Sequence, residues 1–473
     1  MTDWLTASAG AQAKAIRRGA LTAEALMAAT LERIAAENGA LNAIVSLRPE
    51  AELMAEARVA DATGPRGPLH GLPLAVKDLA DAAGLPTSQG SPAFAGQVAE
   101  ADSPHVARLR AGGALVIGKT NTPEFGIGSH TYNPVFGRTA NPYDRARSCG
   151  GSSGGAAVAL AARMVSLADG SDMMGSLRNP AGWCNIYGMR PSWGRVPGGG
   201  EGDLYLHRLS TNGPMARSPG DLALMLDVMS GPAPGQPMMS AFAPVGAVAP
   251  EAEGLRIGWL GDWGGALPME EGILALCESA LGVLDGQGAL VERVAPPIGF
   301  EVLWEAWLGL RAWAQAAGLG DYLDDPAIAP HLKPEAVWEI ETGRALSAME
   351  VNGASLLRSD WYRAAMGLFE RVDVLALPTA QLWPFELGLD WPKEVAGRAM
   401  ETYHQWMAVT VPASLLGLPV VAVPAGFGAG GLPMGLQLIG PEGSDAMLLR
   451  LAEAYHRQTR WPEARPPRRA GQS

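Results

Sequence analysis

The chain has 473 residues, 48% of them hydrophobic and 18% charged, which is typical of a folded globular protein. Its formal net charge of −12 argues against nucleic acid or an anionic membrane as a partner, because phosphate groups would repel it. Three cysteines without a Cys-x-x-Cys pair exclude a disulfide framework and give no zinc pattern, so we expect no metal and no cofactor.

The cellular location of the protein is predicted from the targeting signals that its sequence lacks. The N-terminus has neither the basic start nor the apolar run of a secretory signal. No stretch approaches the ~18 consecutive apolar residues that a membrane span needs. We therefore expect a cytoplasmic protein that does not cross a membrane.

Helical and strand-like segments alternate along the chain. Thr22 is expected to cap a helix that ends near Asn38, because apolar residues recur between them at helical spacing. Ser218 opens a later helix with the character of a capping box. Such alternation indicates an α/β protein with a mostly buried sheet. The other expected helices are residues 104–112 and 156–164, and the expected strands are residues 72–76, 114–117, 255–259, 290–294, 372–377, 420–423 and 436–439.

A segment rich in proline and glycine, residues 231–254, is the best candidate for a domain boundary. It could be an interdomain linker. Strand signals on both sides also fit one large sheet crossed by a long surface connection. We favour the second interpretation, a single domain over residues 1–473.

Two short motifs point to chemistries that their surroundings do not support. Residues 113–120 satisfy the Walker A pattern, but the positions that should form a phosphate-binding loop read Ala-Leu-Val-Ile, which predicts a strand. Residues 150–154 satisfy the Gly-x-Ser-x-Gly nucleophile elbow, yet a polar loop precedes them where that elbow needs a buried strand. Neither nucleotide binding nor an α/β-hydrolase is expected.

The strongest signal is a stretch in which glycines flank serines twice. Residues 149–155 read Cys-Gly-Gly-Ser-Ser-Gly-Gly, and residues 170–180 read Gly-Ser-Asp-Met-Met-Gly-Ser-Leu-Arg-Asn-Pro. Glycines without a Cβ let the backbone approach a ligand closely. A flexible linker would need neither the apolar residues between the two segments nor the charges of Asp172 and Arg178.

These two segments resemble the signature of the amidase signature family. Three further blocks are similar to motifs of the same family, and the resemblance covers most of the chain, least clearly between residues 240 and 370. The separations of 75 residues from Lys77 to Ser152 (152 − 77) and 24 from Ser152 to Ser176 (176 − 152) also agree with it. The three blocks are Gly-Leu-Pro-Leu-Ala-Val-Lys-Asp at 71–78, Gly-Lys-Thr-Asn-Thr-Pro-Glu-Phe at 118–125, and the late pair Gly-Leu-Pro at 417–419 with Gly-Leu-Pro-Met-Gly-Leu-Gln at 431–437.

The resemblance implies a fold and a set of roles. The fold would be a single large mixed β-sheet covered by helices on both faces. Ser176 would be the nucleophile of an amide hydrolase, Ser152 a bridging serine after a cis peptide bond, and Lys77 the base. Lysine can serve as a base only as a neutral amine, so we expect Lys77 to be buried. The backbone N–H groups of Met173, Met174, Gly175 and Ser176 would hold the oxyanion, and Ser153, Asp172 and Arg178 would orient the loops.

Residues 300–370 are expected to be helical and to lie on the substrate side. Their tryptophans would either pack amphipathic helices on the core or line a pocket for the acyl group. The expected partner is a small amide, and the resemblance also allows a homodimer. The tryptophans are Trp304, Trp307, Trp313, Trp338 and Trp361.

The chain departs from the family pattern beside the nucleophile. Met173 and Met174 stand where a Thr-Gly pair is usual, which puts the shape of the pocket and the substrate in doubt. Ser414 stands where asparagine is common, and Cys149 where proline is common. Two alternatives stay open: the glutaminase-type subunit of a tRNA-dependent amidotransferase, and a catalytically inactive scaffold.

Overall fold

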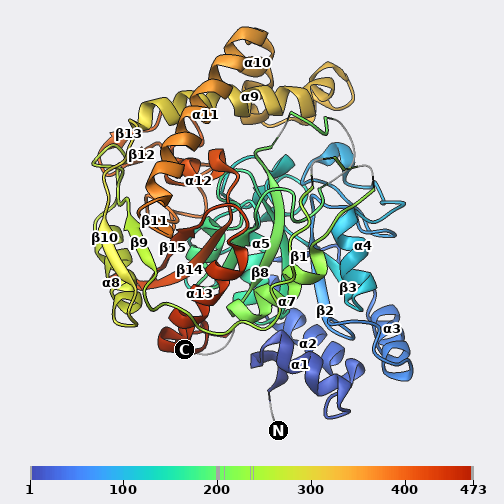
Figure 1. Cartoon of the computed structure of the whole chain (residues 1–473). Helices are drawn as coiled ribbons and strands as arrows, with labels where there is room; N and C mark the ends of the chain where they lie inside the picture. Colours follow the sequence, from blue (N-terminus) through green and yellow to red (C-terminus); the bar gives the residue numbers. More distant parts are fainter. Residues whose placement is uncertain (1–2, 199–202, 207, 235, 238, 470–473) are drawn as a thin grey trace.

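The computed structural model describes residues 3–198, 203–206, 208–234, 236–237 and 239–469. Its helices surround one large sheet of mixed parallel and antiparallel strands (Figure 1). The α-helices are α1 Ala9–Arg17, α2 Ala23–Leu41, α3 Glu50–Ala62, α4 Pro104–Ala111, α5 Gly154–Ala161, α6 Asn179–Trp183, α7 Pro219–Met229, α8 Ile273–Asp285, α9 Phe300–Asp324, α10 Pro334–Ala345, α11 Ala348–Phe369, α12 Val411–Leu416, α13 Asp445–Thr459 and α14 Trp461–Ala464.

The sheet has eleven strands in the order β1-β3-β2-β6-β8-β7-β14-β15-β11-β9-β10. Neighbours pair in parallel at β3-β2, β2-β6, β11-β9 and β9-β10, and antiparallel elsewhere. The mixed sheet that the family resemblance implies is therefore confirmed. Its strands are β1 Ile44–Val45, β2 Pro73–Lys77, β3 Leu115–Thr120, β6 Leu167–Asp172, β7 Tyr187–Arg190, β8 Thr211–Ala216, β9 Arg256–Trp259, β10 Leu290–Arg293, β11 Val374–Pro378, β14 Val420–Phe427 and β15 Pro433–Ile439.

Both faces of the sheet carry packed apolar side chains. Successive side chains of a strand point to opposite sides, so neighbouring residues of one strand join different clusters. On β2, Leu74 and Val76 join the apolar cluster that contains the side chains of α7 and α13. Ala75 between them joins a second cluster with the small side chains of α5.

Short elements complete the fold. Two small hairpins lie outside the main sheet, and short 3-10 helices connect larger elements. The hairpins are β4 Tyr132–Asn133 with β5 Gly137–Arg138, and β12 Glu394–Val395 with β13 Arg398–Ala399. The 3-10 helices are η1 Trp4–Thr6, η2 Pro92–Phe94, η3 Glu124–Gly126, η4 Ala329–His331 and η5 Gln405–Thr410.

Most elements expected from the sequence form close to their predicted bounds. Thr22 caps α2 by accepting the Ala25 N–H, and the Walker-like residues lie in strand β3. Ser218 caps α7, but the predicted capping box does not close. The carboxylate of Asp221 instead accepts the N–H groups of Ala9 and Gly10 at the start of α1. It thereby joins two helices that are about 210 residues apart in the chain.

Strands on both sides of residues 231–254 belong to the same sheet, with β8 and β9 as its nearest members in sequence. The helices of residues 300–370 form one group: α9 packs against α10 and α11 at the opposite end of the molecule from α1 to α3 (Figure 1).

Candidate active site

Lys77 is the last residue of strand β2 and is only 1% exposed. Its Nζ lies 2.7 Å from Ser152 Oγ and 3.0 Å from the hydroxyl oxygens of Ser153 and Ser171. Burial lowers the pKa of this amine to about 7, although the carboxylates of Asp169 and Asp172 work in the opposite direction. A substantial fraction of a lysine with this pKa is neutral at physiological pH.

Ser152 and Ser153 immediately precede helix α5, and the peptide bond between Gly151 and Ser152 is cis. The glycines that follow are required by close packing. A Cβ at Gly155 would lie 2.3 Å from the backbone nitrogen of Asn121, which no real side chain tolerates. The Gly-Gly pair therefore lets this turn approach strand β3 closely enough to present both hydroxyls to Lys77.

Ser176 lies in the loop that joins β6 to α6 and is 7% exposed. It lines a cavity of about 610 Å³ together with Lys77 and Ser152. Its carbonyl oxygen accepts the backbone N–H of Ser153 at 3.3 Å, so the two serine segments are joined directly. Three side chains that lie far apart in sequence thus face one cavity.

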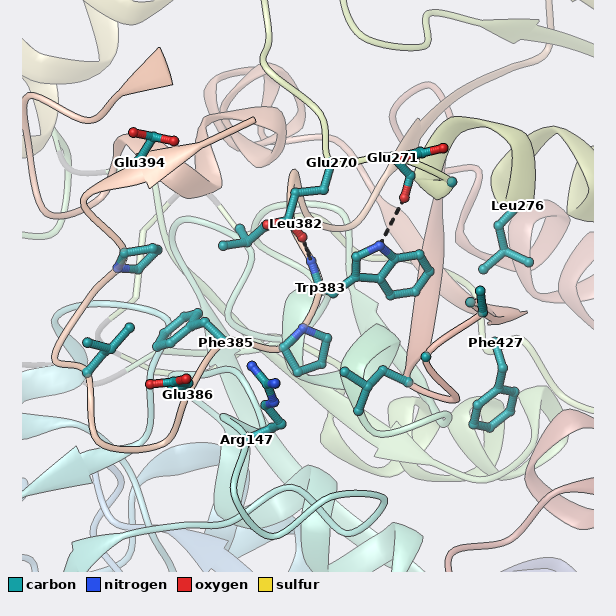
Figure 2. Close-up of a pocket in the computed structure, with 18 of the residues that line it drawn as sticks. Arg147, Glu270, Glu271, Leu276, Leu382, Trp383, Phe385, Glu386, Glu394 and Phe427 are labelled. Atoms are coloured by element: carbon teal, nitrogen blue, oxygen red, sulfur yellow. Dashed lines mark hydrogen bonds between the residues drawn. The ribbon is translucent and has the colours of Figure 1, made fainter. Parts of the chain in front are cut away.

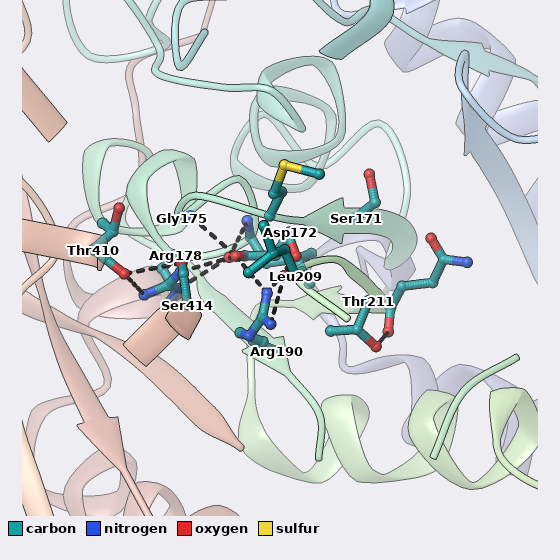
Figure 3. Close-up of polar contacts among 12 residues, drawn as sticks. Ser171, Asp172, Gly175, Arg178, Arg190, Leu209, Thr211, Thr410 and Ser414 are labelled. Carbon is teal, nitrogen blue, oxygen red and sulfur yellow. Dashed lines mark hydrogen bonds and ion pairs between the residues drawn. The ribbon is translucent and has the colours of Figure 1, made fainter. Parts of the chain in front are cut away.

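Asp172 fixes the loop that carries Ser176 (Figure 3). Its carboxylate accepts hydrogen bonds from Nε and Nη2 of Arg178, at 3.0 and 2.9 Å, and from Nη1 of Arg190, at 3.1 Å. It also accepts the backbone N–H groups of Gly175 and Leu177, both at 3.0 Å. Burial alone would raise the pKa of this carboxyl, but the two guanidinium groups and these hydrogen bonds hold it well below its ordinary value.

Arg178 extends the network to the C-terminal part of the chain. Its Nη1 donates to the carbonyl of Thr410 at 3.0 Å and to Gln437 Oε1 at 2.5 Å. Its Nη2 donates to Ser414 Oγ at 2.8 Å, so the serine that replaces the usual asparagine still accepts a hydrogen bond. Arg190 and Thr410 were not singled out in the sequence, whereas Gln437 stood at the end of the late motif.

Gly175 is one of the four residues whose backbone N–H was expected to donate to the oxyanion. Its N–H already donates to Asp172, so an oxyanion would have to compete with a carboxylate for this group. Gly175 has φ +83°, and a Cβ there would lie 2.6 Å from Thr410 Cγ2. The glycine therefore lets the loop turn tightly against η5. The candidate donors that remain are the N–H groups of Met173, Met174 and Ser176.

The two methionines beside Ser176 point in different directions. Met174 is 2% exposed and belongs to the apolar core, so its side chain does not narrow the cavity. Met173 lines the cavity, and its sulfur accepts a hydrogen bond from Arg311 Nη1 at 3.2 Å. Arg311 is held in turn by Glu339 and Tyr403, each at 2.6 Å. Position 173 therefore shapes the pocket, and position 174 does not.

Four of the five tryptophans in the segment 300–370 pack on the core, whereas Trp338 is 37% exposed. Trp307 and Trp361 are fully buried, and no described tryptophan lines the cavity of Ser176. The segment reaches that cavity through two polar side chains of α9, Arg311 and Gln315.

Sequence reasoning also missed a histidine and a carboxylate on the wall of the cavity. His105 of α4 and Asp169 of β6 both line it, and His105 Nε2 lies 3.1 Å from Asp169 Oδ2. Asp169 directly precedes the Gly170 of the signature, so its position in the motif could have drawn attention to it.

A larger cleft of about 1190 Å³ lies elsewhere on the molecule (Figure 2). Its wall combines Trp383, Phe385 and Phe427 with carboxylates. Trp383 is fixed there, because its backbone N–H donates to Glu270 and its indole N–H donates to the carbonyl of Glu271. Among the described residues, this cleft shares no lining residue with the cavity of Ser176. It contains Ser279 and Lys393, but no hydrogen bond joins these two described side chains, so it offers no activated nucleophile.

Within the described ranges, no three His, Cys, Asp or Glu side chains gather as metal ligands would. None of the helices in those ranges combines the length and the apolar character of a membrane span.

The cavity thus holds a buried amine of lowered pKa in contact with a serine hydroxyl, which is the type of site found in serine hydrolases that use lysine as a base. The chain belongs to the amidase signature family: the family described as Amidase matches residues 25–449. It is 33% identical to an acylamidase of Rhodococcus erythropolis over 98% of this chain and 97% of that protein.

Two further comparisons agree. The chain is 36% identical to a glutamyl-tRNA(Gln) amidotransferase subunit of Chloroflexus aggregans, over 98% of this chain and 99% of the other. Among solved structures it resembles a bacterial aryl acylamidase of the amidase signature enzymes, with a TM-score of 0.90 and 27% identity over 97% and 99% of the two chains.

Proposed function

We propose that the protein is an amidase, which hydrolyses a carboxylic amide to an acid and an amine or ammonia through an acyl-enzyme on Ser176. The observation that carries the proposal is the 2.7 Å contact between Lys77 Nζ and Ser152 Oγ on the wall of the cavity that Ser176 also lines. Ser152 is the proton relay and Lys77 the base.

The surroundings of Lys77 suit a neutral amine. Such an amine has two N–H donors and one lone pair, and three hydroxyl groups surround Nζ. In the reactive state, the amine donates to Ser153 and Ser171, and its lone pair accepts the O–H of Ser152. With this assignment, the lone pair of Lys77 Nζ, which is its only site for accepting a proton, points at the hydroxyl of Ser152.

Acylation begins when Ser176 Oγ attacks the amide carbon and forms a carbon–oxygen bond. The Ser176 proton passes to Ser152 Oγ as the Ser152 proton passes to Lys77 Nζ. The electron pair of the carbonyl moves onto its oxygen, where the N–H groups of Met173, Met174 and Ser176 are the proposed donors. One such donor is worth roughly 3 to 4 kcal/mol of transition-state stabilisation.

The tetrahedral intermediate then collapses. The carbonyl reforms, the carbon–nitrogen bond breaks, and the departing nitrogen takes a proton from Ser152, which Lys77 replaces. Water attacks the acyl-enzyme and gives a proton to the same relay, and when the second tetrahedral intermediate collapses the relay returns that proton to Ser176 Oγ. The products are the acid and a free Ser176, so protons and electrons balance without a cofactor.

An amide-panel assay tests this proposal. Aryl, linear aliphatic and cyclic amides are incubated with the wild type and with Ser176→Ala, and acid and amine are measured. We expect hydrolysis by the wild type and a loss of at least about 1000-fold in the variant, with folding intact. Ser279→Ala is the matched control, since this exposed serine of α8 lines the other cleft. Near-native turnover by Ser176→Ala would refute the proposal.

Similarity to the amidotransferase of Chloroflexus aggregans supports one alternative, glutamine hydrolysis within an assembly. The methionine pair beside Ser176 disfavours it, because Met173 occupies the cavity wall where the family usually has a smaller side chain. Glutamine hydrolysis that appears only when partner proteins are added would favour this alternative over the stand-alone amidase.

A further inference from the structure

We propose that Asp169, held in place by His105, is a positioning residue that sets how strongly Lys77 holds its proton. The inference rests on the proposed function, because it concerns the base of that reaction. It assigns a role to two cavity residues that the mechanism above does not use.

Asp169 is 1% exposed and lies on strand β6, next to strand β2. Its Oδ1 accepts the backbone N–H of Lys77 at 2.8 Å, which ties the carboxylate to the residue that carries the base. Its Oδ2 lies 3.1 Å from His105 Nε2 on α4. Both oxygens therefore have partners, and the carboxylate is fixed on two sides.

The hydrogen bonds of His105 indicate a neutral ring. Asn212 Nδ2 lies 3.3 Å from the carbonyl of Pro197 and 3.3 Å from His105 Nδ1. Because this atom faces a carbonyl oxygen, it is the NH2 group of the amide, which only donates. It therefore donates to His105 Nδ1 as well. Nδ1 is then an acceptor and Nε2 carries the proton that it donates to Asp169. This tautomer positions Asp169 without neutralising its charge.

The other buried charges near Lys77 are matched by direct partners. Asp172 is paired with two arginines, and Asp78 lies 3.6 Å from Lys119 on β3. Among the described residues, Asp169 has no ion pair with an arginine or lysine. Its negative charge therefore acts on the nearby buried amines of Lys77 and Lys119 and favours the protonated form of each. In the described part of the chain, the charged or titratable side chains that line the cavity with Lys77 are Asp81, Asp102, His105, Asp169 and Arg311, and those in the adjoining buried network are Asp78, Lys119, Asp172, Arg178 and Arg190.

Two opposing effects set the basicity of Lys77: its burial and its attraction to the carboxylate of Asp169. Burial lowers the basicity of Lys77 and so weakens its ability to take a proton from Ser152. The field of Asp169 offsets part of that effect and keeps the amine basic enough for the relay. A purely structural Asp169 would leave the basicity of Lys77 unchanged.

The test follows the labelling of Ser176 by a fluorophosphonate, which needs the neutral amine but no knowledge of the natural substrate. The labelling rate is measured from about pH 5 to 9. We expect Asp169→Asn to move the midpoint of the acidic limb down by about one pH unit or more, because the ammonium form loses its attraction. The plateau rate should fall several-fold, because the base is weaker.

Three variants make the test decisive. His105→Arg adds a cation beside Asp169 and should shift the midpoint in the same direction. His105→Gln keeps a neutral donor and should leave the midpoint in place. Asp81→Asn removes an exposed carboxylate from the same cavity and should also leave it in place, because water screens that charge. If Asp169→Asn does not fold, the pair His105→Arg and His105→Gln decides the question.

A lower rate at every pH with an unchanged midpoint in both charge-changing variants would overturn the inference. A wild type that is not labelled, or a Ser176→Ala variant that is labelled equally fast, would instead overturn the proposed function and this inference with it.

Discussion

Lys77 Nζ lies 2.7 Å from Ser152 Oγ in a place where the lysine is 1% exposed and the serine 2%. The chain thus keeps an amine out of water and gives it hydroxyl partners instead of a carboxylate in direct contact. Such an arrangement costs stability, because a buried amine resists protonation. It is useful only if the neutral amine has a chemical task.

The first prediction concerns pH. The pKa of Lys77 is lowered to about 7 by burial, and the proposed mechanism uses the neutral form as the base. Activity should therefore rise with pH through about 7 and level off above it. At about pH 5, kcat/KM should be roughly 100-fold below the plateau. A pH profile of kcat/KM on one amide checks this, and a profile that stays flat down to about pH 5 would contradict it.

The second prediction separates stability from activity at Lys77. The difference between the ordinary lysine pKa of 10.5 and about 7 corresponds to about 5 kcal/mol disfavouring the charged form in the folded state. The unfolded chain binds more protons between these two values, so this residue makes stability rise with pH from about 7 to 10.5.

Lys77→Met removes that effect while keeping the volume of the side chain. We expect hydrolysis to fall at least about 1000-fold while the thermal midpoint at neutral pH stays equal or rises. Thermal unfolding and an amide assay are measured on the same preparation. A variant that loses stability and activity together would point to a structural lysine.

A third prediction tests the buried network around Asp172. Arg178→Met leaves the carboxylate with an incomplete set of partners in a fully buried place. We expect a loss of about 3 to 5 kcal/mol in the free energy of unfolding, measured with denaturant. Arg344→Met is the matched control, because its ion pair with Asp324 is exposed, and it should cost far less stability than Arg178→Met. Equal losses would argue against a special role for the network.

The fourth prediction distinguishes the two methionines. Met174→Ala should lower the free energy of unfolding by about 2 to 5 kcal/mol, because it opens a cavity in the core, and should leave substrate preference unchanged. Met173→Ala should change substrate preference and leave the free energy of unfolding nearly unchanged, since this side chain lines the cavity of Ser176. Unfolding curves and KM values over a panel of acyl groups compare them. A change in preference caused by position 174 would contradict the described packing.

Four strands of the main sheet were not predicted from the sequence: β1 lies at its edge, whereas β6, β8 and β7 lie side by side in its centre. Strand β6 reads Leu-Ala-Asp-Gly-Ser-Asp and has no apolar run, because it carries residues of the site. A Cβ at Gly170 would lie 2.6 Å from Ser153 Oγ, so packing against the serine turn requires a glycine there. Strand β8 contains Gly213 and Pro214, which ordinarily argue against a central strand. Close packing overrides strand propensity at both places.

The site was predictable to the extent that its members lie in local motifs. Lys77, Ser152 and Ser176 stand in three glycine-rich or strand-ending segments that the sequence displays directly. Arg190 on β7 and His105 on α4 stand in no such segment, and only the folded chain brings them to Asp172 and Asp169. Contacts of this kind depend on strand order, which alternating hydrophobicity does not encode.

The most direct test of the account is to locate the acyl group that the enzyme carries. The wild type and Lys77→Met are treated with an activated ester at about pH 8, quenched in acid, digested and measured by mass spectrometry. The account predicts an acyl adduct on Ser176 of the wild type and formation at least about 100-fold slower in Lys77→Met. An adduct on Ser152 or on a cysteine, or one that forms equally fast without the lysine, would contradict it.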